Sequence, residues 1–166
     1  MSDTAVGVAG DWHWNISHGL KVIEQFHGLG IKKVFQLGDF GLWGSLLKDR
    51  HDKFRWRLQQ KLEKYDMLLF VTLGNHENYD LFEKFEPVTA GPWAGFIHEP
   101  KAPRILYFQR GQSLILGDRS FLSIGGAASI DYKWRKLGES IWEQERITRE
   151  DVRKTLEEAD RLGSVD

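Results

Sequence analysis

The chain of 166 residues contains no cysteine. Disulfide frameworks and thiolate zinc sites are therefore excluded, and any metal ion must be held by carboxylate, amide or imidazole groups. No apolar run approaches the length of a membrane span, so no membrane partner is expected. The first four residues also lack the basic and apolar regions of a signal peptide, which favours the cytoplasm as the location.

An excess of charge of one sign is also absent, because the formal net charge is −1. This balance provides no broad attraction to nucleic acid, which leaves nucleic acid as a conceivable but disfavoured partner. Hydrophobic residues make up 41% of the chain, an ordinary share for a globular protein. Because no internal repeat or low-complexity linker interrupts it, the sequence predicts a single domain over residues 1–166.

The first half of the chain alternates short apolar runs with amphipathic stretches. Residues 5–10, 33–37 and 67–73 have the pattern of buried strands, whereas residues 16–28 and 47–65 have the apolar spacing of helices. This β-α-β-α-β order predicts an α/β fold with parallel strands and right-handed crossovers. In the second helix the side opposite the apolar stripe of Phe54, Leu58, Leu62 and Tyr65 includes Arg55, and we expect that side to be solvated.

The second half has a different pattern. Its four prolines all fall within residues 87–103, which predicts an irregular surface loop. Residues 105–108, 113–116 and 121–124 are β-type runs separated by turn residues, and they predict an antiparallel meander beside the parallel unit. The last element is a helix over residues 149–162. Its N-terminus matches a capping box, and its expected buried stripe consists of Val152, Leu156, Ala159 and Leu162.

Polar residues follow each of the three strands predicted in the first half. Asp11 and His13 are two residues apart, so in an extended segment their side chains can chelate one ion. Asp39 follows the second strand, and its two carboxylate oxygens can bridge two cations. Asn75 and His76 follow the third strand with an amide oxygen and an imidazole. Because the carboxyl ends of parallel strands converge at one edge, the three clusters predict one metal site.

Each cluster taken alone also has a structural interpretation. Asp39 after a glycine is typical of a turn or helix cap, and Asn75 with His76 is typical of a turn that starts a helix. Glu77 either accepts a hydrogen bond from His76 and orients it, or is solvated. Tryptophan is similarly open to two interpretations. Three tryptophans near the first two clusters either pack in the core or form an aromatic wall beside a site: Trp12, Trp14 and Trp43.

The conjunction of the clusters resembles a known family. Three motifs carry the resemblance: Asp11-x-His13-x-Asn15, Gly38-Asp39 and Gly74-Asn75-His76-Glu77. They are similar to the first three sequence blocks of the calcineurin-like metallophosphoesterases. Residues 125–145 also look like a bacterial and phage branch of that superfamily. The resemblance implies an α/β fold of the metallophosphoesterase type, a layered β-sandwich flanked by helices.

The resemblance also implies a set of metal ligands. Asp11 and His13 would hold a first metal ion, Asp39 would bridge to a second, and Asn75 would bind the second. Oxygen and nitrogen donors of this kind suit Mn²⁺, which we expect, and are compatible with Fe, Ni²⁺ and Zn²⁺. Two such ions would activate a hydroxide for in-line attack on phosphorus.

The same resemblance implies that two further residues contact the substrate. His76 would lie near the phosphate as a general acid or electrostatic clamp, and Asn15 would lie near the substrate pocket. The expected activity is phosphoester hydrolysis, of a phosphodiesterase-like kind, on a small phosphoester or nucleotide. A nuclease acting on nucleic-acid ends is a weaker hypothesis, because the chain has no basic stripe.

The chain departs from the family pattern in its later histidine blocks, which are absent. Its other histidines do not lie in such motifs: His18, His27, His51 and His98. His51 is expected to be solvated, and His98 is a less favoured substitute ligand. We therefore expect an incomplete, C-terminally truncated domain that holds two metal ions, one or none. The alternative function is a metal-binding remnant that acts in assembly or regulation. A sheet edge exposed by truncation would favour a homo-oligomer.

Overall fold

The computed structural model describes residues 5–43 and 48–165, and of residues 48–52 only the backbone. Its centre is a six-stranded mixed sheet with the order β1-β2-β3-β6-β5-β4. The strands span Val6–Ala9 (β1), Lys33–Leu37 (β2), Leu68–Thr72 (β3), Glu86–Pro87 (β4), Ile97–His98 (β5) and Ile105–Tyr107 (β6). Residue 47 and the side chain of His51, for both of which the sequence made predictions, lie outside the described part.

The first three strands and β6 run parallel, which confirms the parallel arrangement predicted for the first half. Within one row of the sheet, Ala9 of β1 is opposite Gln36 of β2, which is opposite Val71 of β3. The chain therefore leaves all three strands at the same edge. This shared edge is what brings together the loops that begin near residues 10, 38 and 73.

The predicted meander is wrong in its first strand. β6 does not pair with the next strand but lies parallel to β3, with Leu106 opposite Phe70. Only β7 (Gln112–Leu116) and β8 (Arg119–Ser123) form an antiparallel hairpin. The proline-containing stretch also contributes two short strands, β4 and β5, to the antiparallel edge of the sheet. All three residues of β6 are buried. A strand that is buried on both faces suits a parallel position within a sheet, and β6 occupies such a position beside β3.

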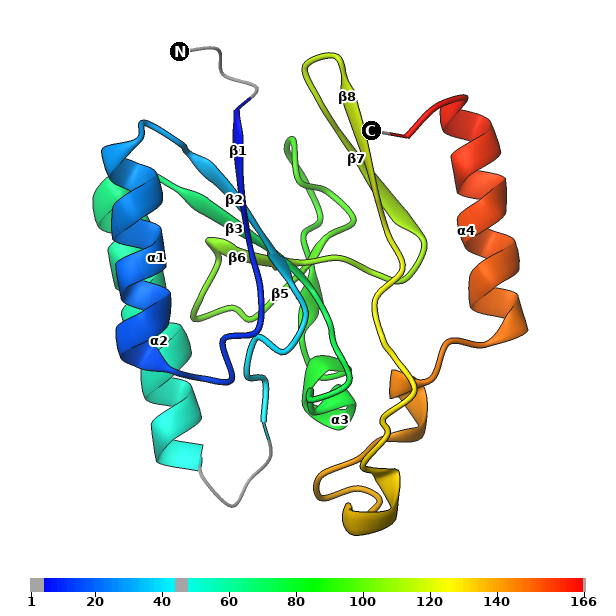
Figure 1. Cartoon of the computed structure of the whole chain (residues 1–166). Helices are drawn as coiled ribbons and strands as arrows, with labels where there is room; N and C mark the ends of the chain where they lie inside the picture. Colours follow the sequence, from blue (N-terminus) through cyan, green and yellow to red (C-terminus); the bar gives the residue numbers. More distant parts are fainter. Residues whose placement is uncertain (1–4, 44–47, 166) are drawn as a thin grey trace.

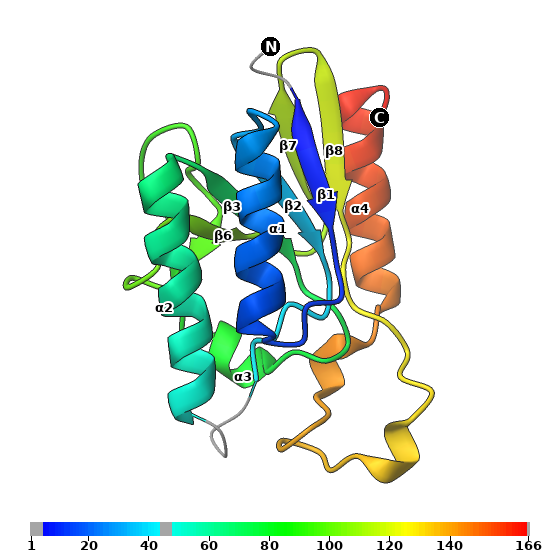
Figure 2. The same ribbon diagram turned by 60° about the vertical axis from the view of Figure 1, so that its left-hand side comes forward.

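The sheet is buried on both faces by different layers. On one face, Val34 and Leu69 pack against α1 (Ile16–Gly28) and α2 (Lys48–Tyr65). On the other face, Phe35 and Phe70 pack against the β7–β8 hairpin. Figure 1 shows these layers with α4 (Arg149–Leu162) outside the hairpin, and Figure 2 shows α1 and α2 side by side. The layered α/β sandwich flanked by helices is confirmed.

Helix α2 has one feature that the sequence misassigned. Phe54, Leu58 and Leu62 are fully buried as predicted, but Arg55 is only 3% exposed and not solvated. Its Nε atom lies 2.6 Å from Oε2 of Glu99, a residue in the proline-containing stretch. Because the partner lies 44 positions away in sequence, helical spacing alone could not reveal this ion pair. None of the described helices is long and apolar enough to cross a membrane.

Helix α4 starts with the capping box that the sequence predicted, between Thr148 and Asp151. Its expected buried stripe is wrong, since Val152 is 43% and Leu156 is 60% exposed. The helix instead turns a partly polar side toward the hairpin, where the Ser113 hydroxyl donates to a carboxylate oxygen of Glu158. The hairpin offers polar partners on its outer side, and these partners set the rotation of the helix.

Candidate metal and catalytic site

The loops after β1 and β2 are locked together beyond the end of the sheet. The backbone N–H of Asp11 donates to the carbonyl oxygen of Gly38 at 3.1 Å, and that of His13 donates to the carbonyl oxygen of Asp39 at 2.7 Å. The φ angles of Asp11, His13 and Asp39 are 60°, 42° and 50°. Such left-handed conformations are costly for residues other than glycine, and strained backbone of this kind concentrates at functional sites.

These conformations bring three ligand-type side chains together. Nε2 of His13 lies 2.8 Å from Oδ1 of Asp11 and 3.7 Å from Oδ2 of Asp39. The potential ligand atoms of the three residues all lie within 4.8 Å of one another. Ligands bound to one ion at about 2.1 Å stand roughly 3–4 Å apart, so this donor set fits a divalent metal ion. The Asp39 side chain is 21% exposed and that of Asp11 is 79% exposed, which leaves the group open to solvent.

Asp39 presents its two oxygens to different neighbours. Oδ2 is the atom nearest to His13, whereas Oδ1 accepts a hydrogen bond from the backbone N–H of His76 at 3.1 Å. A Cβ atom at Gly74 would lie 2.3 Å from Oδ1, so only glycine permits this approach of the third loop. The two oxygens of Asp39 thus face the loop after β1 and the loop after β3.

The third loop brings Asn75 and His76 to the same place. Nδ2 of Asn75 donates to the Ser129 hydroxyl at 2.9 Å. The His76 ring lies with its centroid 5.3 Å from that of His13, edge to face, and is stacked at 6.2 Å on Trp43. The structure thus places side chains from the three predicted clusters at one edge of the sheet.

A comparison with models of known families shows which family these motifs belong to. The model of the calcineurin-like phosphoesterases matches residues 4–160. The chain belongs to this family. Membership implies metal-dependent hydrolysis of phosphoesters, and the Asp11–His13–Asp39 group could hold such a metal. No curated protein matches the chain.

Glu77, the last residue of the third motif, has a role that neither sequence interpretation foresaw. Its side chain is fully buried and accepts hydrogen bonds from the backbone N–H groups of Phe40, Gly41 and Leu42. Burial raises the pKa of its carboxyl to about 8, with the Asp39 charge adding to the rise, while the three N–H donors favour the ionised form. Glu77 therefore anchors the loop that carries Asp39.

The tryptophans divide between the two interpretations. Trp12 is 1% exposed and belongs to the core. The ring centroids of Trp14 and Trp43 lie 5.2 Å apart, and the Trp43 ring is also stacked on His76. Two of the three tryptophans therefore form an aromatic surface beside the candidate site. Asn15 is used locally, since its side chain accepts from the backbone N–H of His18 at the start of α1, and its contact with substrate stays a prediction.

The remaining histidines do not complete the ligand set in the part of the chain that the structure describes. The only group of three or more metal-binding side chains found there is Asp11, His13 and Asp39. His27 is exposed and stacks on Tyr65, with ring centroids 3.9 Å apart. His98 lies in β5, at the antiparallel edge of the sheet.

Sequence reasoning assigned no role to three residues that adjoin the site. Ser129 contacts the Asn75 amide, and Arg135 donates to the Asn75 carbonyl oxygen at 3.0 Å. Glu145 accepts from Ser129 at 3.3 Å and is 1% exposed; burial raises the pKa of its carboxyl, and the adjacent Arg135 charge opposes the rise. Only the resemblance of residues 125–145 to relatives marked this segment, and it did not indicate a contact with Asn75.

Proposed function

We propose that this chain is a metal-dependent phosphoesterase that hydrolyses a small phosphodiester or nucleotide, with Mn²⁺ as the preferred ion. The observation that carries the proposal is the convergence of Asp11, His13 and Asp39 at one strand edge in strained backbone conformations.

We assign the residues as follows. Asp11 and His13 would hold one ion, Asp39 would bridge through its two oxygens, and Asn75 would contribute its amide oxygen to the second. Divalent ions bound there would supply a nucleophilic hydroxide at neutral pH and neutralise charge on the phosphoryl oxygens. The His76 imidazole would donate a proton to the leaving oxygen or hold the phosphoryl group by charge. The stacking of its ring on Trp43 supports a fixed position for the imidazole.

An assay on a chromogenic phosphodiester with Mn²⁺ tests the proposal. Asp39→Asn should reduce turnover by at least about 100-fold, because loss of a residue that merely supports a ligand already costs about 10- to 100-fold. The matched control is Asp118→Asn, which changes an exposed residue in the β7–β8 turn and should retain full activity. Wild-type turnover no greater than that of Asp39→Asn would overturn the proposal.

His76 can be separated from the ligands in the same assay. His76→Ala should leave Mn²⁺ affinity near the wild-type value while turnover falls about 100-fold, the usual contribution of a positioned acid or base. His18→Ala removes another imidazole, an exposed one on α1, and should have no effect. A parallel loss of Mn²⁺ affinity in His76→Ala would instead make His76 a ligand.

The second candidate function is a metal-binding module without turnover, active in assembly or regulation. The observation that favours it is the three-membered ligand group, which the other described histidines do not extend. Equilibrium dialysis with Mn²⁺ distinguishes the two functions. One ion per chain together with absent phosphodiesterase activity supports the module, and two ions with turnover support the enzyme.

A further inference from the structure

The segment between β8 and α4 adjoins the proposed metal site at one ligand. It includes two short 3₁₀ turns, Tyr132–Trp134 and Glu143–Glu145, and leaves the sheet as an extended loop (Figure 1). Two of its residues hold Asn75 from different directions. Ser129 contacts the side-chain amide, and Arg135 contacts the backbone carbonyl.

The Ser129 hydroxyl has three neighbours, and their chemistry fixes the direction of each hydrogen bond. Arg135 can only donate, and its Nη1 lies 2.6 Å from the Ser129 oxygen. The Glu145 carboxylate can only accept, and its Oε1 lies 3.3 Å away. A hydroxyl has one proton and two lone pairs. Its proton therefore points to Glu145, and one lone pair faces Arg135.

One lone pair of Ser129 then remains for the neighbour at 2.9 Å, the Asn75 amide. Only the nitrogen end of an amide can donate to it, so Nδ2 must face Ser129 and Oδ1 must face away. This distinction matters because an amide binds a metal ion through its oxygen, and the two ends are otherwise similar in shape. The three polar residues select one of two orientations of Asn75.

We propose that Ser129 is a positioning residue, held in place by Arg135 and Glu145, that turns the Asn75 amide so that its oxygen is presented to the metal site. The inference rests on the proposed function, since it takes Asn75 as a metal ligand. It adds a specific requirement to that function, because correct ligation depends on a segment that contributes no ligand itself.

The Arg135 guanidinium is committed to this role and is not free to bind phosphate. It is 7% exposed, and each of its three nitrogens has an acceptor. Nε donates to the Ser140 carbonyl oxygen, while Nη2 lies 3.0 Å from the Asn75 carbonyl oxygen and 3.4 Å from Glu145. Nη1 adds Asp131 at 3.6 Å to its bond with Ser129. A planar guanidinium whose three nitrogens all donate to acceptors holds those acceptors in fixed positions, and in this sense Arg135 braces the loop.

Isothermal titration of the full chain with Mn²⁺ tests the inference without relying on turnover. Ser129→Ala should weaken the Mn²⁺ site that Asn75 serves by about 10-fold or more, the usual effect of removing a residue that orients a ligand. Ser17→Ala is the matched control, because Ser17 is exposed on α1 and should leave the affinity unchanged. Arg135→Lys should also weaken binding, since one ammonium cannot replace the bonds of the fork.

A second background separates positioning from general stability. Asn75→Asp places an oxygen at both ends of the side chain, so its orientation no longer matters. In that background Ser129→Ala should have little effect on Mn²⁺ affinity, although it weakens binding by about 10-fold in the Asn75 background.

The outcomes distinguish failure of the inference from failure of the proposed function. Equal Mn²⁺ affinity of wild type and Ser129→Ala overturns the inference and leaves the metal site standing. An equal loss in both the Asn75 and Asn75→Asp backgrounds also overturns it, because the serine would then act only on stability. A wild-type chain that binds no Mn²⁺ overturns the metal site and, with it, this role of Ser129.

Discussion

The helices of the two halves of the molecule are held in place by different forces. Between the sheet and the first two helices, Ile23, Leu58 and Leu62 are all completely buried in one apolar cluster. The last helix, α4, has no fully buried residue and contacts the hairpin largely through polar side chains. The helices of the first half, which provides the proposed ligands, are therefore fixed by apolar burial, whereas α4 in the second half is fixed largely by directional polar contacts.

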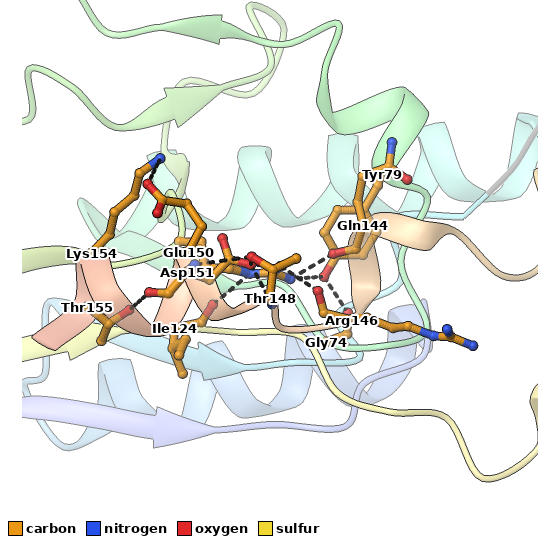
Figure 3. Close-up of polar contacts among 11 residues, drawn as sticks. Gly74, Tyr79, Ile124, Gln144, Arg146, Thr148, Glu150, Asp151, Lys154 and Thr155 are labelled. Carbon is orange, nitrogen blue, oxygen red and sulfur yellow. Dashed lines mark hydrogen bonds and ion pairs between the residues drawn. The ribbon is translucent and has the colours of Figure 1, made fainter.

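Arg110 is the centre of these polar contacts. Its guanidinium donates to the carbonyl oxygens of Ile124, Gln144 and Arg146 at 2.8–3.1 Å and lies 3.1 Å from Oδ2 of Asp151. Figure 3 shows these residues converging from the strand exit, the loop before α4 and α4 itself. One side chain thus joins three parts of the second half. From this comparison we expect that a change of charge, pH or one residue can loosen α4 while the first half stays folded.

The largest effect should come from the apolar half. Leu58→Ala removes a fully buried side chain and should lower the free energy of unfolding by about 3 kcal/mol, the usual cost of a cavity in a packed core. Leu156→Ala is the matched control on α4. Because Leu156 is 60% exposed, its truncation should change the free energy by less than about 0.5 kcal/mol. Urea denaturation measures both, and equal losses would refute the contrast between the halves.

The next largest effect concerns the buried anchor of the Asp39 loop. Glu77→Gln keeps the size of the side chain but places an amide nitrogen against backbone N–H groups, since both oxygens of Glu77 accept from them. The free energy of unfolding should fall by about 2 kcal/mol. Glu86→Gln, an exposed change in β4, serves as the control. An unchanged urea midpoint in Glu77→Gln would show that these hydrogen bonds do not anchor the loop.

A smaller, local effect is expected in the polar half. Arg110→Gln removes the charge opposite Asp151 and most of the carbonyl contacts, and it should lower the free energy of unfolding by about 1 kcal/mol. Because the contacts join α4 to the rest, amide hydrogen exchange should accelerate in α4 and remain unchanged in α1. Arg153→Gln, whose partners Glu150 and Glu157 both lie within α4, should leave the exchange of the helix near wild type. Uniform acceleration across the chain would contradict a separately held half.

The smallest effect is a pH dependence of the α4 contact. The Arg161 guanidinium, and then the Ser113 hydroxyl, lower the pKa of Glu158 from 4.5 to about 2. Since the folded-state pKa lies below the unfolded one, the stabilisation is complete above pH 4.5 and is lost as the pH falls toward 2. Carboxyl NMR titration should give a midpoint near 2, and Arg161→Gln should raise it toward 4.5. A wild-type midpoint already at 4.5 would remove this contribution.

Local patterns determined much of the fold and most of the proposed site. The sequence predicted several elements correctly: the strand before Asp11, the capping box of Thr148 and the two main helices of the first half. Each of these depends on neighbours within a few residues. The three clusters were placed on one edge correctly because parallel strands end together.

Contacts between distant residues were decided only by the tertiary structure. The pairing of β6 with β3, the burial of Arg55 against Glu99 and the rotation of α4 all depend on partners outside any local window. The contact between Asn75 and Ser129 spans 54 positions in sequence. The sequence by itself thus determined which side chains gather at one edge of the sheet. Packing and ion pairing decided what holds them there, because the partners of a buried polar group are the donors and acceptors that the fold brings to it.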